Sequence, residues 1–139
     1  MERSADVATY LNRLYEQFNS GDVSAIGDYL SADSNVLGIG TDPREWWVGS
    51  EAVRSAWNTQ LPEMHAAGIK FISGDVEAFS EGSVGWFADR MSIQVPDGSA
   101  VPARVSGVCR REDGAWKLVQ MHMSFGVTNE EVLGEELTI

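Results

Sequence analysis

The sequence has 139 residues and a formal net charge of −11, from 10 Lys and Arg against 21 Asp and Glu. A chain of this length can fold as one domain with its own hydrophobic core. The acidic excess argues against partners such as nucleic acid or an anionic membrane, because both need a cationic surface. The single cysteine, Cys109, excludes an internal disulfide and fits a reducing, cytoplasmic location. No apolar run is long enough to span a membrane.

The N-terminal third is predicted to be helical. Over residues 4–19 apolar side chains recur three and four positions apart, as on one face of a helix. Ser4 is the predicted N-cap, and Gly21 belongs to the stop signal. A short helix is expected within residues 22–30, and the apolar run at residues 36–40 predicts a strand.

A further helix is predicted, with Ser50 as its N-cap. Its apolar stripe consists of Val53, Ala56, Trp57 and Leu61. Pro62 must lie past this helix or kink it, because proline lacks the backbone N–H that a helix interior needs.

From Ile69 onward the hydrophobic pattern has a period of two, which predicts strands. The predicted strands span residues 69–80, 83–95, 100–111 and 115–126. Their tight joins indicate an antiparallel meander, and Asp113-Gly114 is typical of a type I′ hairpin turn. Residues 127–139 form an acidic C-terminal tail, in which Thr128 and Glu131 can make a capping box. Helices followed by a long sheet indicate an α+β fold.

Two-residue loops at Asp97-Gly98 and Asp113-Gly114 would place Arg90, Val105 and His122 side by side on one face of the sheet. Gln120 and Ser124 would share that face. The other face would carry Asp89, Met121 and Met123. A single bulge would reverse part of this assignment, because successive residues of a strand point to opposite faces.

Both predicted faces are rich in apolar side chains, whereas the helices can cover only one of them. The uncovered face is therefore predicted to pack against a second copy in a two-fold homodimer. The side chains predicted for this interface are Val119, Met121, Met123 and Phe125.

Three polar residues are the predicted catalytic candidates. His122 could act as a general base, because the pKa of imidazole lies near working pH. Arg90, on the same predicted face, could hold an anionic ligand group. The alternative for His122 is a structural histidine bonded to its neighbours. Asp89 is predicted to pair with Arg104 on the outer face. If a bulge turns Asp89 inward, it becomes the leading proton-transfer carboxylate, because an apolar pocket raises the pKa of a carboxyl group.

Aromatic residues could form a pocket for a flat or apolar small molecule. Trp47 and Trp86 are the best candidates for its walls, which Tyr10 and Tyr29 could extend. Gln120 and Ser124 are predicted to contribute polar groups. Two histidines and one cysteine do not make a metal cluster, and no cofactor is predicted.

The chain resembles the SnoaL-like branch of the nuclear transport factor 2-like (NTF2-like) superfamily. The resemblance rests on the helical N-terminal third, the Trp47-Val48-Gly49-Ser50 turn and the segment 110–126, RREDGAWKLVQMHMSFG. It covers roughly residues 4–133, so residues 1–139 are expected to form a single domain. It implies a cone in which a strongly bent antiparallel sheet holds the N-terminal helices in its concave face. A pocket at the open end and dimers through the outer sheet face are implied as well.

Two functions fit this resemblance. The first is a pocket protein that binds a small apolar or aromatic molecule, with isomerase, lyase or hydrolase activity by proton transfer. The second is a non-catalytic dimerisation or ligand-binding module, as in the association domain of a calcium/calmodulin-dependent kinase. The isomerase-type set of two aspartates and a tyrosine has no clear match here, which favours the second.

Overall fold

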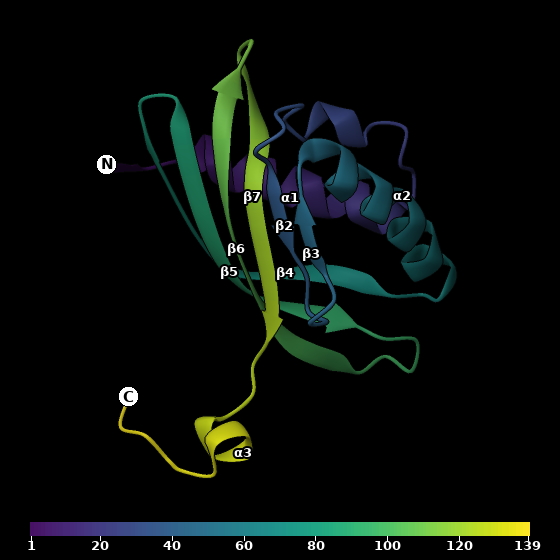
Figure 1. The fold of residues 1–139 in the computed structure, drawn as a ribbon, viewed down its shortest axis with the longest axis vertical. Helices are drawn as coiled ribbons and strands as arrows, with labels where there is room; N and C mark the ends of the chain where they lie inside the picture. The colour runs from purple at the N-terminus through teal and green to yellow at the C-terminus, as the bar shows by residue number, and fades with distance from the viewer.

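The computed structural model describes residues 1–139 and shows a curved sheet that wraps around two long helices (Figure 1). The helices are α1 (Ala5–Ser20), the 3₁₀ turn η1 (Ile26–Asp28), α2 (Ser50–Ala66) and α3 (Asn129–Leu133). The strands are β1 (Glu2–Arg3), β2 (Leu37–Ile39), β3 (Trp46–Val48), β4 (Lys70–Glu81), β5 (Val84–Gln94), β6 (Ala100–Glu112) and β7 (Ala115–Phe125).

The sheet has the strand order β1-β4-β5-β6-β7-β2-β3. Strands β4 to β7 form the predicted antiparallel meander. Strand β2, however, pairs with β7 in parallel, so the sheet is mixed and not wholly antiparallel. A three-residue strand carries no sequence signal for its direction, which depends on how the chain returns to the sheet edge.

Local sequence signals set the helix limits. The Ser4 hydroxyl accepts a hydrogen bond from the N–H of Val7 at 3.2 Å, and Gly21, with φ of 69°, ends α1. Ser50, the predicted N-cap of α2, is instead its first helical residue, and Gly49 is the N-cap. Pro62 lies inside the helix. Only the 3₁₀ turn η1 occupies the predicted short helix.

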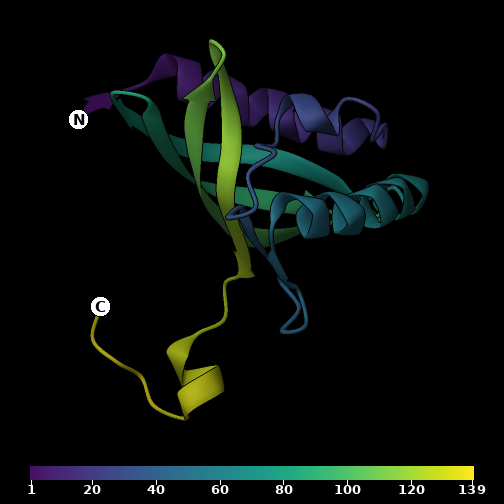
Figure 2. The ribbon, with the colours of Figure 1, turned by 45° about the horizontal axis from the view of Figure 1, so that its top comes forward.

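Both long helices lie in the concave face of the sheet, where they cover one continuous core (Figure 2). The core includes Val7, Leu11 and Leu14 of α1, with Val53 of α2. This is the α+β cone that the sequence predicts. Neither helix is long and apolar enough to cross a membrane.

The predicted register of the meander is wrong at two places. The loop between β5 and β6 has three residues, Pro96, Asp97 and Gly98, because Gln94 pairs with Ala100 and the N–H of Val95 bonds to the carbonyl of Ser99. Gly98 has φ of 87°, as expected for the third position of such a loop. The Asp113-Gly114 turn has the predicted pairing of Glu112 with Ala115.

A bulge between Val108 and Cys109 then shifts the β6–β7 pairing by one residue. The bulge leaves His122 opposite Ser106. The three-residue loop places Arg90 opposite Arg104. Each one-residue shift reverses which β6 side chains share a face with a neighbouring strand.

The concave face carries the buried side chains Asp89, Val105 and Met121, whereas Arg90 and His122 are exposed on the convex face. Arg90 and His122 do share a face, as predicted, but it faces away from the helices. The sequence pattern could not decide this, because both faces are rich in apolar residues.

The tail, residues 127–139, projects away from the cone, and all of its residues are exposed (Figures 1 and 2). Its short helix α3 has the predicted capping box between Thr128 and Glu131. Gly134, with φ of 74°, ends the helix.

Candidate functional site

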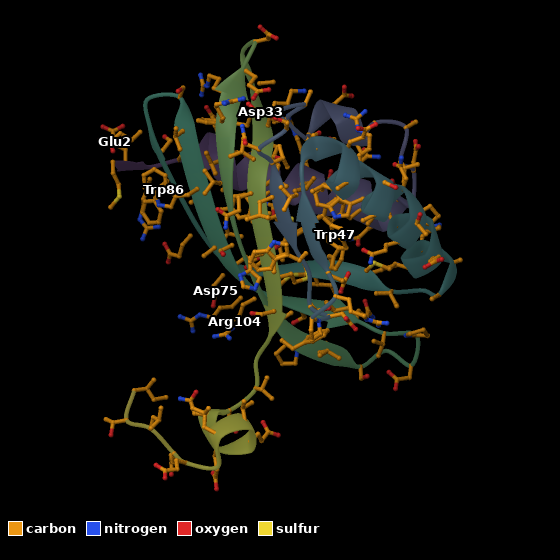
Figure 3. The ribbon with its side chains drawn as sticks, in the orientation of Figure 1. Glu2, Asp33, Trp47, Asp75, Trp86 and Arg104 are labelled. Carbon is orange, nitrogen blue, oxygen red and sulfur yellow. The ribbon has the colours of Figure 1, made fainter.

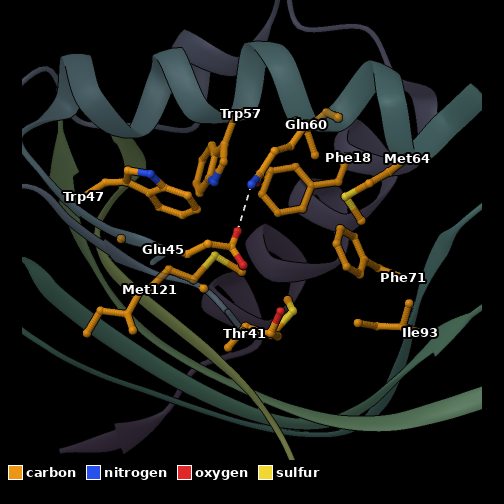
Figure 4. A pocket seen from close by; sticks show the side chains of 15 residues that line it. Phe18, Thr41, Glu45, Trp47, Trp57, Gln60, Met64, Phe71, Ile93 and Met121 are labelled. Carbon is orange, nitrogen blue, oxygen red and sulfur yellow. Dashed lines mark hydrogen bonds between the residues drawn. The ribbon is translucent and has the colours of Figure 1, made fainter. Parts of the chain in front are cut away.

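A cavity of about 120 Å³ opens between α2, the β2–β3 hairpin and the concave face of the sheet (Figure 4). Its apolar wall combines aromatic and aliphatic side chains from seven elements. These are Phe18, Ile39, Trp47, Trp57, Leu61, Met64, Phe71, Ile93, Met121 and Met123. The remaining lining residues are Gly38, Gly40, Thr41, Glu45 and Gln60, so Glu45 is the only charged residue of the cavity.

The carboxylate of Glu45 is held in place by two donors. The backbone N–H of Asp42 donates to Oε1 at 2.8 Å, and the Nε2 group of Gln60 donates to Oε2 at 2.8 Å. Figure 4 shows the Gln60 bond reaching across the cavity from α2. Each carboxylate oxygen can accept more than one hydrogen bond, so Glu45 can still accept a bond or a proton from a bound molecule.

The position of Glu45 depends on the hairpin that carries it. Gly40 and Glu45 close this hairpin through a backbone hydrogen bond of 2.9 Å. A Cβ atom at Gly40 would come within 2.7 Å of the Glu45 side chain. Glycine at position 40 therefore lets the carboxylate fold over the strand towards the cavity.

An ion pair fixes the tip of the same hairpin. The Nε of Arg44 donates to Asp42 Oδ1 at 2.9 Å, and its Nη2 donates to Oδ2 at 3.0 Å. These bonds, with one from the Arg44 backbone, lower the pKa of Asp42 to about 2. Asp42 therefore stays ionised at neutral pH, and its backbone N–H is held towards Glu45.

A second carboxylate, Asp89, is enclosed deeper in the cone and does not line the cavity. It is 3% exposed. Tyr15 donates to its Oδ2 at 3.0 Å, Ser73 donates to the same atom at 3.3 Å, and the N–H of Gly74 donates to Oδ1 at 3.1 Å. Burial, together with the nearby negative charge of Asp89, raises the pKa of Tyr15 well above its usual range. Tyr15 thus remains a hydrogen-bond donor.

Asp89 therefore faces inward, which is the alternative that the sequence left open. Its predicted pairing with Arg104 does not form, because Asp89 and Arg104 lie on opposite faces of the sheet. The bulge in β4 between Ile72 and Asp75 brings the Gly74 N–H to the carboxylate.

The other predicted catalytic residues, Arg90 and His122, line a hollow of about 430 Å³ on the convex face. Ser124 lines the same hollow, and Gln120 lines the adjoining one. The sheet itself separates these four residues from the cavity.

Of the two best wall candidates from the sequence, Trp47 and Trp86, only Trp47 lines the cavity. Trp86 lies on the convex face, where it stacks on Phe79 with ring centroids 6.1 Å apart. The Tyr10 hydroxyl donates to the carbonyl oxygen of Tyr29 at 2.7 Å, and both residues line a different surface hollow. Burial raises the pKa of Tyr10.

The residues predicted for a dimer interface do not share a face. Met121 and Met123 line the cavity inside the cone. Val119 is the extra residue at the β7 bulge and lines a convex hollow with Val84. Phe125, at the end of β7, is 42% exposed. The bulge separates Val119 from the two methionines, and the methionines lie inside because the helices cover their face of the sheet.

Sequence reasoning missed Glu45 and Gln60, the polar pair of the cavity. Glu45 follows a turn-forming stretch and precedes two tryptophans, so it reads as a solvent-exposed turn residue. A signal was present at Gln60, which lies three residues after Trp57 and four before Met64, on the apolar side of α2. No three His, Cys, Asp or Glu side chains lie close enough together to hold a metal ion.

The bent sheet around two helices, with a cavity at its open end, defines the class of nuclear transport factor 2-like cones. Residues 7–128 match the SnoaL-like domain family, so the chain belongs to that family. No curated protein matches the sequence.

Solved structures with this fold share little sequence with the chain. A nuclear transport factor 2-like protein of unknown function from Pseudomonas putida has a TM-score of 0.76 and 15% identity, over 96% of this chain and 92% of that one. A proposed dehydratase of the same family from Streptomyces avermitilis has a TM-score of 0.74 and 19% identity, over 88% and 95%. A proposed calcium/calmodulin-dependent kinase II association domain from Xanthomonas campestris has a TM-score of 0.68 and 15% identity, over 91% of this chain and 95% of that one. At these identities the likeness shows the fold alone.

Proposed function

We propose that this SnoaL-like protein binds a compact, largely apolar small molecule in the cavity, and that Glu45 accepts a proton from it. The observation that carries the proposal is the Glu45 carboxylate, held by Gln60 and by the Asp42 N–H inside an otherwise apolar wall. A positioned carboxylate within hydrogen-bond reach of a ligand is the minimum that general-base catalysis requires.

The size of the cavity limits the ligand. An engineered apolar cavity of about 150 Å³ in another protein holds a benzene molecule. The present cavity, of about 120 Å³, therefore suits a five- or six-membered ring or a similar part of a larger molecule. Trp47 and Trp57 offer flat surfaces to such a ring.

The reaction class that fits is proton abstraction from an acidic C–H or O–H group, followed by isomerisation or elimination. Hydrolysis by a water molecule that Glu45 activates would use the same base. Glu45 replaces Arg90 and His122 as the proposed catalytic residue, because those two side chains lie on the other face of the sheet. Asp89 is already bonded to three donors, so we assign it a structural role.

The test uses 2-cyclopenten-1-one, a compact ring that carries acidic C–H groups beside a carbonyl. Binding is measured by tryptophan fluorescence, and proton transfer by NMR detection of deuterium uptake in D₂O. We expect the wild-type protein to accelerate uptake. Glu45→Gln should keep the fluorescence change but lose about 10²–10⁴-fold in exchange rate. Asp75→Asn, on the convex face, is the matched control and should change neither signal.

A second variant separates binding from chemistry. Met121→Trp should fill the cavity and abolish both signals. One outcome would overturn the catalytic proposal in favour of a ligand-binding module. In it, the ligand binds and Met121→Trp abolishes the binding, but no deuterium exchange depends on Glu45. Exchange that is unchanged in Glu45→Gln would remove Glu45 as the base.

We also propose that the protein is a homodimer through the convex face of the sheet. Strands β4 to β7 leave Trp86 and Val108 there without a covering helix, which supports the proposal. A monomer in sedimentation velocity at micromolar concentration would contradict it. The lone, buried Cys109 forms no disulfide, which supports the proposed cytoplasmic location.

A further inference from the structure

Two features of the molecule have no partner within the protomer: the convex face of the sheet and the tail. We propose that in the dimer the tail of each copy docks on the convex hollow of the other copy. The convex hollow is the part of the outer sheet face lined by Trp86, Ala88, Arg90, Arg104, Ser106 and His122. The proposal adds a contact to the proposed dimer and does not depend on the ligand of the cavity.

The convex hollow holds two unpaired cations. Arg90 and Arg104 lie directly opposite each other on neighbouring strands, an arrangement that is unfavourable for like charges. Neither forms an ion pair within the protomer. Three acidic residues line the hollow beside them. Glu77 is paired with Arg3 at 2.7 Å, and the Asp89 carboxylate is bonded to three donors. Asp75 is thus the one remaining carboxylate for two guanidinium groups.

Beside the cations, the convex hollow continues into a largely apolar part. Its charged part measures about 430 Å³ and adjoins a part of about 410 Å³ lined by Phe79, Trp86 and Val108. The small side chains of Ala88 and Ser106 belong to both parts and leave room for an incoming segment. Figure 3 shows Trp86, Asp75 and Arg104 projecting from the same side of the sheet.

The tail has the complementary chemistry. Its residues 130–136 include the acidic side chains Glu130, Glu131, Glu135 and Glu136. Two apolar side chains of α3, Val132 and Leu133, are 67% and 62% exposed. A helix of five residues is too short to be stable without tertiary packing, so a partner surface for α3 is physically required if it is to persist.

The direction of the tail favours a second copy as the partner. After Phe125 the chain leaves the end of β7, and α3 stands clear of the sheet to which it is attached (Figures 1 and 2). The segment therefore reaches outward, where a two-fold related copy would present its own convex hollow. Two-fold symmetry makes the exchange reciprocal, so each pair of copies would form the contact twice.

Charge reversal tests the proposal in the full-length chain. The hollow variant carries Arg90→Glu and Arg104→Glu. The tail variant carries Glu130→Lys, Glu135→Lys and Glu136→Lys, and keeps Glu131 because it belongs to the capping box. Alone, each variant places like charges against each other at both contacts of the dimer: carboxylates of the tail against carboxylates of the hollow in one variant, and lysines against arginines in the other. We expect the dissociation constant of each dimer to rise about 100-fold or more, measured by sedimentation and native mass spectrometry.

Mixing the two variants separates exchange between copies from docking within one copy. A heterodimer would place the reversed tail against the reversed hollow and the native tail against the native hollow. We therefore expect the mixture to give a one-to-one heterodimer. The control Arg54→Glu with Lys70→Glu changes the net charge as the hollow variant does, and it should remain a dimer. Circular dichroism checks that every variant is folded.

Three results would overturn the proposal. Variants that are each as dimeric as the wild type would show that the tail is not needed, although the dimer itself would stand. Variants that remain monomeric after mixing would exclude exchange between copies. A monomeric wild-type protein would overturn both the exchange and the dimer. None of the three results would bear on the role of Glu45.

Discussion

Two carboxylates inside the cone differ in what surrounds them, and this difference assigns their roles. Glu45 borders the cavity and has one donor on each oxygen. Asp89 is enclosed by donors from α1 and β4. Ionised carboxylates are costly to bury unless they are hydrogen-bonded, so the donors around Asp89 are required for stability. Glu45 is the carboxylate that remains accessible to a ligand.

The hydroxyl of Tyr15 is predicted to stabilise the fold through Asp89. In Tyr15→Phe the buried carboxylate loses one donor, which should lower the free energy of unfolding by about 1–3 kcal/mol. Urea denaturation followed by tryptophan fluorescence measures the change. The hydroxyl of Tyr29 donates no hydrogen bond in the protomer, so Tyr29→Phe is the matched control, with a change within about 0.5 kcal/mol. Equal effects of both substitutions would show that the Tyr15 bond contributes nothing specific.

At the scale of elements, the bulge in β4 links the sheet to α1. It turns the Gly74 N–H towards Asp89, whose other oxygen accepts from Tyr15 of α1. A Cβ atom at Gly74 would collide with the backbone carbonyl of Arg90 on β5. Backbone atoms cannot move aside as the end of a flexible side chain can, so only glycine fits this position.

Gly74→Ala is accordingly predicted to disturb the β4–β5 pairing at the bulge. We expect a loss of about 2–4 kcal/mol in unfolding free energy, or failure to fold, because a buried carboxylate loses its backbone donor and the strands are forced apart. Gly126→Ala meets no atom within 4 Å and serves as the control. Thermal unfolding compares the two. An unchanged melting temperature in Gly74→Ala would contradict this account of the bulge.

At the scale of the whole molecule, the core between the helices and the sheet contains acids that burial keeps protonated. Cys109 is completely buried, and burial raises its pKa from 9.0 to about 12. In the unfolded chain the thiol ionises near pH 9, whereas in the folded protein it stays neutral. The unfolded state is therefore favoured as the pH rises from about 9 towards 12.

The predicted consequence is a loss of stability in alkaline solution. The contribution is fully present below pH 9, and about 1 kcal/mol of unfolding free energy should be lost between pH 8 and pH 10. Cys109→Ala should show a smaller decrease over the same interval, because the ionising group is gone. Urea denaturation at both pH values measures the slope. Identical slopes in wild type and variant would show that Cys109 does not cause the decrease.

The sequence by itself determined the local elements and the family. Helix α1, the meander β4 to β7, the Asp113-Gly114 turn and the capping box of α3 are all encoded by residues close together in the chain. Hydrophobic periodicity, cap residues and turn residues act over a few positions, so they can be read without knowing the fold. The three-residue loop also had a local signal, a glycine at its last position, Gly98.

Only the tertiary structure decided which face of the sheet is concave and which residues meet in the cavity. Glu45 and Gln60 are fifteen positions apart, on a hairpin and on a helix, and no pattern relates them. The bulge at Val108 moves the register by one residue, and such a shift exchanges the two faces of a strand. The alternation along β7 already put Met121 and Met123 on the opposite face from His122, but only the packing of the helices decided that the methionines lie inside the cone and His122 outside. The site therefore depended on how the helices and the β2–β3 hairpin pack against the sheet, whereas the local elements did not.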